Sequence, residues 1–441
     1  MRSTTDGSNK FGDIIKLCNE IDDLLSQKGG DKFELRSIGH EMMKSNSEFY
    51  QSGVDVGKNS FSTLATEPEN KRDLAMSFLA NIYSAWTIQN KSEFNVLEIG
   101  AGSGDLIKEI FAIRNEVLES ESSSKTHKDF FKSLKFNIVD FPEMIKIQKE
   151  KLGEDAKNVN FIEHDISKEL LPSASFDVIY GNEIPDTQRV DFLEVKKDDK
   201  TGEKRFFLRA LKKMPSGETS EVLAGISSSP EIIAEIGKNL FPIDELEPGV
   251  YKLQFGFHAL MHNIKQSVKS PYGTFILTDY FDFKKKFSTR DLSFAGIDGS
   301  SHEEVKKFLA IGEPGKQLIE AKNMYGANFD VTYPPNVGRD TCDLFSFYVS
   351  SFSVDDRSKV IVNLKFKSLE LIDRLGKDPL FGEKFMFFLE GINLHDRELM
   401  PTELSQCRKL IKIQQEQEAS PGVAPSSGVG SKAKEQNNQS K

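Results

Sequence analysis

Apolar residues recur along this chain at two different spacings, and their order predicts an α/β fold. Between residues 13 and 25 they come every third or fourth position, as on one face of a helix. Further on, short apolar runs end at small or acidic residues, which is typical of buried strands and the loops that leave them. These runs lie at residues 95–99, 136–140, 159–166, 176–186 and 273–283. Helix-period segments follow the first two runs, as expected for an open parallel sheet.

Three glycines at alternate positions follow the first predicted strand and indicate a cofactor loop. Gly100, Gly102 and Gly104 permit positive φ and let a ligand approach the backbone. A helix-period pattern begins directly after them, so its first N–H groups can face a charged ligand. The third glycine comes one residue too early for a dinucleotide fingerprint, and no Gly-Lys-Ser/Thr follows, which excludes a P-loop. A tight strand-to-helix turn without a ligand is the simpler alternative.

With Glu98 in front, the loop has the spacing Glu-x-Gly-x-Gly-x-Gly. This spacing resembles the first motif of class I S-adenosylmethionine-dependent methyltransferases. The resemblance implies a Rossmann-like sheet and S-adenosyl-L-methionine as cofactor. It also implies that Glu98 faces the cationic methionine end of that cofactor and that the glycines make room for it.

Acidic residues end the next two predicted strands. Asp140 is placed for a bidentate bond to ribose hydroxyls, the role of the ribose-binding acid in dinucleotide folds. Asp165 is placed to accept from an adenine amino group. The alternative for both is that they end strands or cap helices.

The fourth and fifth predicted strands also end in polar residues, at the edge of the sheet where ligands bind. Asn182, Glu183 and Asp186 follow the fourth strand, and Asp279 ends the fifth. We expect Asn182 to contact the cofactor and Glu183 to hold the methyl acceptor and take its proton, with Asp186 and Asp279 as supporting acids. A purely structural acid in an exit loop is the alternative for Glu183.

A narrower resemblance, to the MidA-like family of these methyltransferases, covers residues 48–394. Its N-terminal aromatic pair and Asp-Phe-x-Thr-x-Pro-Glu element, its Asn-Glu-x-x-Asp loop and its Asp-Tyr-Gly motif have counterparts here. They lie at Phe49, Tyr50, Phe61, Thr63, Pro68, Glu69, Asn182, Glu183, Asp186, Asp279 and Tyr280. The chain departs from the family at Ala101 and Ser103 in the glycine loop, and at Pro334 and Asn336 where the family has histidine and aspartate. Because members methylate protein arginine in mitochondrial complex I assembly, the resemblance implies a protein substrate.

Composition limits the other function classes. The 58 Lys and Arg against 68 Asp and Glu give a net charge of −10, which argues against a general nucleic-acid binder. Three separated cysteines fit a reducing compartment and do not suggest a zinc site.

No apolar stretch approaches the roughly 18 residues of a membrane span, and the cytoplasm is the expected location, with the mitochondrion as the alternative. His258 and His262 have helical spacing, but their apolar surroundings favour packing over metal binding.

The expected organisation follows from these patterns. We predict a loose N-terminus at 1–10, a helical region at 11–93, the cofactor domain at 94–283 with a β-hairpin insertion at about 187–260, a mixed C-terminal substrate region at 284–413 and a disordered tail at 414–441. The predicted function is methyl transfer to a protein side chain, arginine by family resemblance. Two alternatives stay open: an inactive assembly or scaffold protein that binds the cofactor, and a small-molecule O- or N-methyltransferase.

Overall fold

The computed structural model describes ten parts of the chain. They are residues 6–30, 32–51, 68–184, 187–240, 243, 246–269, 273–280, 328–332, 345–351 and 374–382. The chain divides into two compact units, Met1–Asp396 and Arg397–Lys441, and every described residue belongs to the first.

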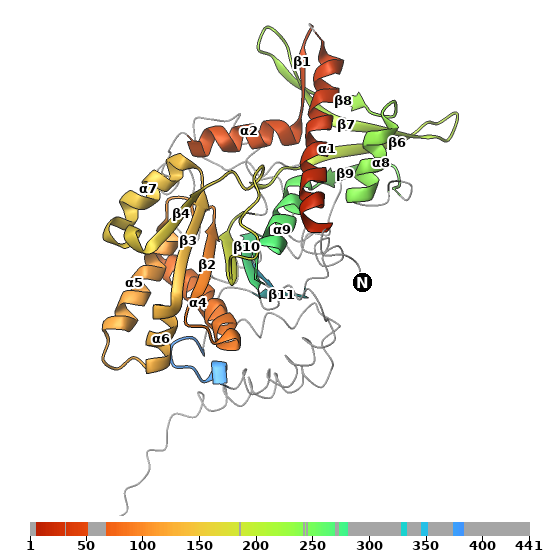
Figure 1. The fold of residues 1–441 in the computed structure, drawn as a ribbon. Helices are drawn as coiled ribbons and strands as arrows, with labels where there is room; N and C mark the ends of the chain where they lie inside the picture. Colours follow the sequence, from red (N-terminus) through yellow and green to blue (C-terminus); the bar gives the residue numbers. More distant parts are fainter. Residues whose placement is uncertain are drawn as a thin grey trace, which may run out of the picture. The chain divides into compact units, whose positions relative to one another are not determined.

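A seven-stranded sheet holds the cofactor loop (Figure 1). In spatial order its strands are β11 (Asn328–Thr332), β12 (Phe345–Ser351), β10 (Thr274–Tyr280), β5 (Val178–Asn182), β2 (Phe94–Ile99), β3 (Leu134–Asp140) and β4 (Val159–Glu163). Strands β10, β5, β2, β3 and β4 are parallel, β12 runs antiparallel to β10, and β11 runs antiparallel to β12. The strand order reverses between β2 and β5, and open α/β sheets bind ligands at such a switch point.

Alternate residues of the central strands pack on opposite faces of this sheet. From β2, Phe94 and Val96 join a core with helices on one face, whereas Leu97 and Ile99 join a core on the other. The helices of the first core are α4 (Pro68–Gln89), α5 (Asp105–Glu119) and α6 (Lys125–Ser133). The second core contains α9 (Phe255–Ser267). Helix α7 (Pro142–Leu152) and the short η1 (Gly153–Asn158) connect β3 to β4.

A second, five-stranded antiparallel sheet combines the N-terminal part of the chain with a segment more than 150 residues later (Figure 1). Its strands are β1 (Glu34–Ser37), β6 (Asp191–Lys197), β7 (Lys204–Lys213), β8 (Thr219–Gly225) and β9 (Gly249–Leu253). Helices α1 (Asp6–Gly29) and α8 (Pro230–Asn239) share one apolar core with it. Helix α2 (Ile38–Gln51) follows β1 directly.

The N-terminal region differs from the sequence prediction in two respects. Helix α1 begins at Asp6, within the segment 1–10 that its polar composition predicts to be loose. The region 11–93 is not purely helical, because β1 at Glu34–Ser37 pairs with β7. That pairing depends on residues far along the chain, which a local apolar period cannot reveal.

Inside the expected insertion, β6 and β7 form an antiparallel hairpin. Its turn is closed by Asp198 N–H donating to the Glu203 carbonyl at 2.8 Å, with Gly202 at φ +74°. Most of the predicted region 284–413 and all of the tail 414–441 lie outside the described residues.

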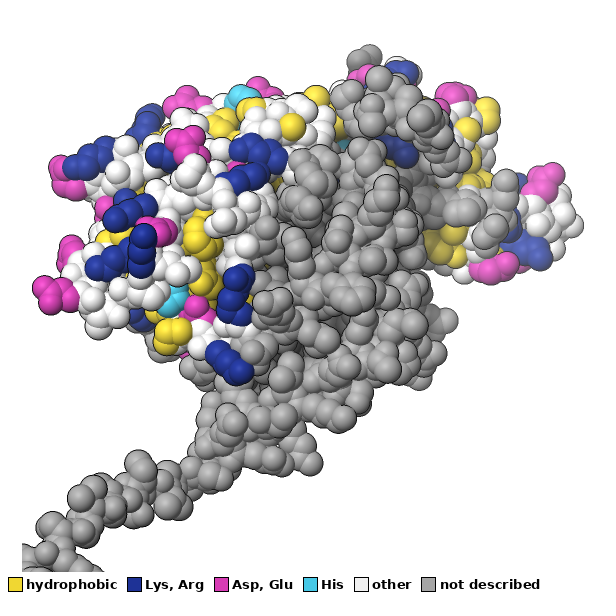
Figure 2. Space-filling view, turned by 60° about the horizontal axis from the view of Figure 1, so that its bottom comes forward, with side chains coloured by type: hydrophobic (Ala, Val, Ile, Leu, Met, Phe, Trp, Pro, Cys, Tyr) yellow, Lys and Arg dark blue, Asp and Glu magenta, His cyan; other side chains and the backbone are white. Residues whose placement is uncertain are grey.

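Charges on the described surface are mixed. Figure 2 shows Lys and Arg side chains interspersed with Asp and Glu over the described part of one face. Several charged side chains of the described residues form ion pairs, such as Arg72 with Glu116 at 2.6 Å and Lys157 with Glu154 at 3.0 Å. Among the described helices, none combines the length and apolar character needed to cross a bilayer.

Candidate functional site

The glycine loop leaves β2 and enters α5 through three left-handed residues. Gly100, Gly102 and Gly104 have φ of +59°, +54° and +82°. A Cβ on Gly100 would lie 2.5 Å from Ile184 Cδ1, whereas a Cβ on Gly102 would meet no atom within 4 Å. Close packing of Ile184 therefore requires glycine at position 100. The backbone at Gly102, by contrast, borders open space.

Glu98 is a buried acid directly before this loop. It is 2% exposed, and its Oε2 accepts a hydrogen bond from the Tyr180 hydroxyl at 2.8 Å. The pKa of Glu98 is raised to about 8, mainly by burial; the Tyr180 hydrogen bond opposes this shift, and the nearby Asp140 adds to it. An incoming positive charge beside Glu98 would favour its ionised form.

Asp140, the last residue of β3, is held at the edge of the sheet beside the loop. Its Oδ1 accepts from the Phe141 backbone N–H at 2.8 Å and its Oδ2 from Gln148 Nε2 at 2.7 Å. Burial raises the pKa of Asp140 to about 7, although hydrogen bonds from Phe141, Gln148 and the Gly102 backbone oppose the shift. A carboxylate offers about four acceptor positions, so the three hydrogen bonds to Asp140 leave room for about one more, to a hydroxyl group.

Asp165 lies in the turn after β4, and its side chain bonds within that turn. Its Oδ1 accepts from the backbone N–H and the hydroxyl of Ser167, and its Oδ2 pairs with Lys168 at 2.8 Å. These contacts all lie within one turn, and adenine recognition by Asp165 stays a prediction.

The loop after β5 packs directly on the glycine loop. Asn182 Nδ2 donates to Glu183 Oε1 at 3.3 Å, and Glu183 has φ +54°, which is rare for a residue with a side chain. The next residue, Ile184, is buried against Gly100 and also lies close to Gly181, where a Cβ would be 3.0 Å from Ile184 Cγ1. The structure thus brings Asn182 and Glu183 to the glycine loop, as the strand order predicts.

The side chains of two predicted acids lie outside the described residues. Asp186 lies outside the described residues. The backbone of Asp279 lies in β10, paired with Ser346 of β12, and its side chain is outside the described part. Their supporting roles stay predictions.

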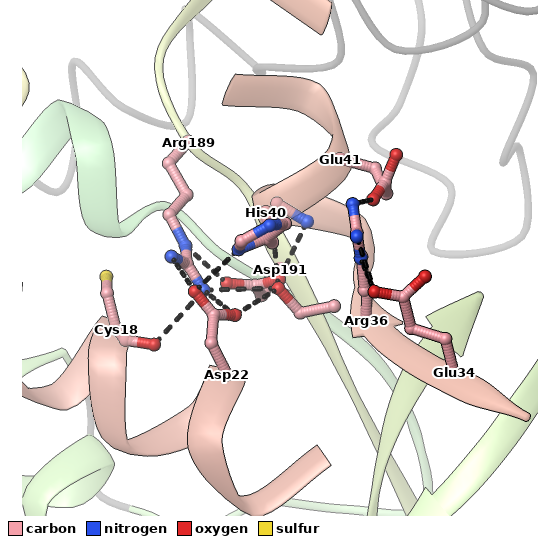
Figure 3. A network of polar contacts seen from close by, with 10 residues as sticks. Cys18, Asp22, Glu34, Arg36, His40, Glu41, Arg189 and Asp191 are labelled. Carbon is pink, nitrogen blue, oxygen red and sulfur yellow. Dashed lines mark hydrogen bonds and ion pairs between the residues drawn. The ribbon is translucent and has the colours of Figure 1, made fainter. Parts of the chain in front are cut away.

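The exit of the β5 loop is anchored by residues that the sequence analysis missed. Asn46 on α2 donates to the Thr187 carbonyl at 2.9 Å, and Gln188 Nε2 donates to the Ile184 carbonyl at 3.1 Å. Arg189 then enters a buried network that joins this segment to α1 and β1 (Figure 3). No local pattern marks Arg189, because its partner Asp22 is 167 positions away.

The Arg189 network uses nearly all guanidinium donors (Figure 3). Nη1 and Nη2 donate to the two carboxylate oxygens of Asp22, both at 2.9 Å, and Nε donates to Asp191 Oδ2 at 2.9 Å. Ser37 Oγ lies 3.1 Å from Nη2, and His40 Nδ1 lies 3.0 Å from Asp22 Oδ2. These contacts fix where the chain leaves the β5 loop.

His258 and His262 are both buried on α9. Burial lowers the pKa of His262 to about 3, with smaller effects from the positive charges of Lys10 and Lys265 and from His258. Within the described residues, no group of three or more His, Cys, Asp and Glu side chains could hold a metal ion.

Comparisons with known proteins point to one family. A model of the family described as "Putative S-adenosyl-L-methionine-dependent methyltransferase" matches residues 78–313, more than half of the 441 residues. The chain is similar to the structure of a COG1565 superfamily member from Burkholderia thailandensis bound to S-adenosyl-homocysteine, at 15% identity and a TM-score of 0.50, over 79% of this chain and 95% of that chain. A native structure of a COG1565 superfamily protein from the same organism gives 14% identity and a TM-score of 0.48, over 80% and 98%. Among curated proteins, none matches this chain in sequence.

Proposed function

Since the chain belongs to the MidA-like family of class I S-adenosyl-L-methionine-dependent methyltransferases, we propose that it methylates a protein side chain, an arginine guanidinium nitrogen. The family defines the cofactor and the reaction type. The acceptor is the part that we propose.

The residues at the switch point fit this cofactor, which supplies a methyl group on a positively charged sulfur. The backbone at Gly102 borders open space, and Asp140 retains acceptor capacity for a ribose hydroxyl. Among the described residues, no cationic side chain pairs with the buried Glu98, and its raised pKa falls when a positive charge lies beside it. These three features lie on adjacent strands β2 and β3 and on the loop between β2 and α5.

The observation that carries the acceptor proposal is the strained Glu183 beside the glycine loop. A non-glycine residue at φ +54° costs on the order of 1–3 kcal/mol, and such strain persists only where the surroundings hold it. Ile184 against Gly100 and the hydrogen bonds of Thr187 and Gln188 supply that support. Strained residues cluster at active sites, which favours a chemical role for Glu183.

A carboxylate at this position suits a guanidinium acceptor. A guanidinium has only donors and keeps its charge, with a pKa above about 12, so charge-assisted hydrogen bonds to a carboxylate orient it. The same carboxylate can accept the proton that the nitrogen loses on methylation. Holding the nucleophile in line and away from water supplies most of the remaining catalysis.

The test is transfer of labelled methyl from the cofactor to proteins of a cell extract, followed by identification of the labelled amino acid. We expect label on arginine, and we expect Glu183→Gln to lower transfer about 10²- to 10⁴-fold, the usual range for a general base. Glu150→Gln, at an exposed position of α7, is the matched control and should leave transfer unchanged.

Other outcomes identify the alternatives. S-adenosylhomocysteine binding without any label transfer would support a scaffold protein. Label confined to small metabolites would support a small-molecule methyltransferase. Label on lysine or another protein residue would contradict the arginine assignment alone.

A further inference from the structure

Gln148 on α7 connects the two sides of the cofactor site. Its side-chain amide donates to Asp140 Oδ2 at 2.7 Å and to the Gly102 carbonyl at 2.9 Å. Both amide hydrogens are therefore used, one on the predicted ribose acid and one on the glycine loop. We propose that Gln148 is a positioning residue that holds Asp140 and the glycine loop in the arrangement a ribose-bearing cofactor requires.

The buried amide oxygen of Gln148 lowers the stability of the folded chain. The side chain has no exposed surface, and its Oε1 has no hydrogen-bond partner among the described residues. A buried acceptor without a partner is destabilising, and an apolar side chain of similar shape would avoid that cost. Turning the amide over would only place its oxygen against the Asp140 carboxylate and the Gly102 carbonyl. The two acceptors therefore fix both the residue type and its orientation.

The position of Gln148 in the helix supports a specific role. Its neighbours on the buried face of α7 are the apolar residues Met144, Ile145 and Leu152, so a polar residue interrupts an apolar stripe. Its stem also packs on the loop, since a Cβ on Gly104 would lie 3.4 Å from Gln148 Cγ. Helix α7 is thus docked on the glycine loop at the residue that also bonds Asp140.

Loss of the Gln148 donor has a defined effect on Asp140. The hydrogen bond favours the carboxylate, so removing it raises the pKa of Asp140 above its already elevated value of about 7. Among the described residues, Glu98 on β2 interacts electrostatically with Asp140, and Glu163 is its register partner on β4. Helix α7 also carries Lys151, which pairs with Asp105 of α5. Gln148→Met removes none of these charges. A change in pH dependence therefore reports the loss of the Gln148 hydrogen bond.

The test is the affinity for S-adenosylhomocysteine at pH 6, 7, 8 and 9, measured by calorimetry on the full chain and on Gln148→Met. One lost hydrogen bond to a charged group changes an ionisation equilibrium by roughly tenfold. We expect binding by Gln148→Met to be weaker than wild type at every pH, because its bond to the glycine loop is lost, and the deficit to be about fivefold larger at pH 7 than at pH 9. For the isosteric Gln148→Glu, the binding deficit should instead grow as pH rises. Its protonated carboxyl group can donate to Asp140 at pH 6, whereas its carboxylate repels the Asp140 carboxylate at pH 9.

Asn137→Leu is the matched control. Asn137 is another buried amide on β3, it donates to the Val96 carbonyl, and its oxygen is bonded by Asn160. It should lower the melting temperature without shifting the pH dependence of binding. The proposal is wrong if both Gln148 variants weaken binding equally at every pH, or if they change only the melting temperature, as Asn137→Leu does.

The proposal rests on the family's cofactor and not on the arginine acceptor. The experiment uses no acceptor, so a failed transfer assay would leave it standing. Absence of S-adenosylhomocysteine binding by the wild-type chain would overturn it.

Discussion

Replacing Arg189 with methionine gives the most informative test of how the β5 loop is anchored. The side chain of Arg189 is 11% exposed and bridges Asp22, Asp191 and Ser37 (Figure 3). In Arg189→Met, Asp22 keeps its hydrogen bond from Ser37. Among the described residues, the partner left to the Asp191 carboxylate, which is 1% exposed, is the Gly39 N–H at 2.8 Å.

The expected cost of Arg189→Met comes mainly from the stranded Asp191 charge. Removing one partner of a buried ion pair costs about 3–5 kcal/mol, a large share of the roughly 5–15 kcal/mol that stabilises a typical domain. Arg72→Met is the control, because Arg72 is 48% exposed and its pair with Glu116 contributes about 0–1 kcal/mol. Urea unfolding followed by circular dichroism measures both changes.

A double substitution separates the stranded charge from other effects. Adding Asp191→Asn to Arg189→Met removes the uncompensated carboxylate, so the double variant should be more stable than Arg189→Met alone. The reasoning is refuted if Arg189→Met lowers the free energy of unfolding by less than about 1 kcal/mol. It is also refuted if the loss in the double variant equals the sum of the losses in Arg189→Met and in Asp191→Asn.

The same network predicts a pH dependence. Although burial alone would raise the pKa of Asp22, hydrogen bonds from His40 and Arg189 lower it from 3.8 to about 2. A lowered carboxylate pKa contributes stability that is present above the unfolded value and lost as pH falls through the folded value. Because this contribution depends partly on Arg189, the stability difference between wild type and Arg189→Met should shrink between pH 4 and pH 2.

Two further predictions concern the cofactor loop. Gly100→Ala should abolish measurable S-adenosylhomocysteine binding, because its Cβ would lie 2.5 Å from Ile184 Cδ1 at φ +59°. Gly153→Ala, at φ +57° with no atom within 4 Å, should lower the melting temperature but leave binding intact, and equal binding by both variants would contradict the packing argument. The folded pKa values of Glu98 and Asp140, about 8 and about 7, exceed their ordinary values, so the melting temperature of the free protein should fall as pH rises from 5 to 8. Glu98→Gln should weaken that slope, and an unchanged slope would exclude Glu98 as its source.

The cofactor half of the fold could be predicted because its signals are local. Buried strands and the three glycines of positive φ are readable within a dozen residues, and the strand ends then place Asp140 and Glu183 at one edge. Asp165 shows the limit of this reasoning, because an acid after a strand also suits a cap, and its side chain bonds within its own turn.

The remaining features depend on contacts between distant residues. Strand β1 is only four residues long and exists because β7 pairs with it. The sequence around Arg189 does not distinguish it from a surface arginine, because its partner Asp22 comes close only in the folded chain. Gln148 carried a usable signal, a polar residue within an apolar stripe, but its partners Asp140 and Gly102 are fixed by the packing of α7.

The most direct test of the cofactor site is calorimetric titration of S-adenosylhomocysteine into the wild-type chain, Asp140→Asn and the exposed control Asp129→Asn on α6. We predict saturable one-to-one binding by the wild type and the control, and affinity at least about tenfold lower for Asp140→Asn, because a ribose-binding carboxylate is lost. No saturable binding by the wild type, or equal affinity of all three proteins, would contradict the site assigned to this chain.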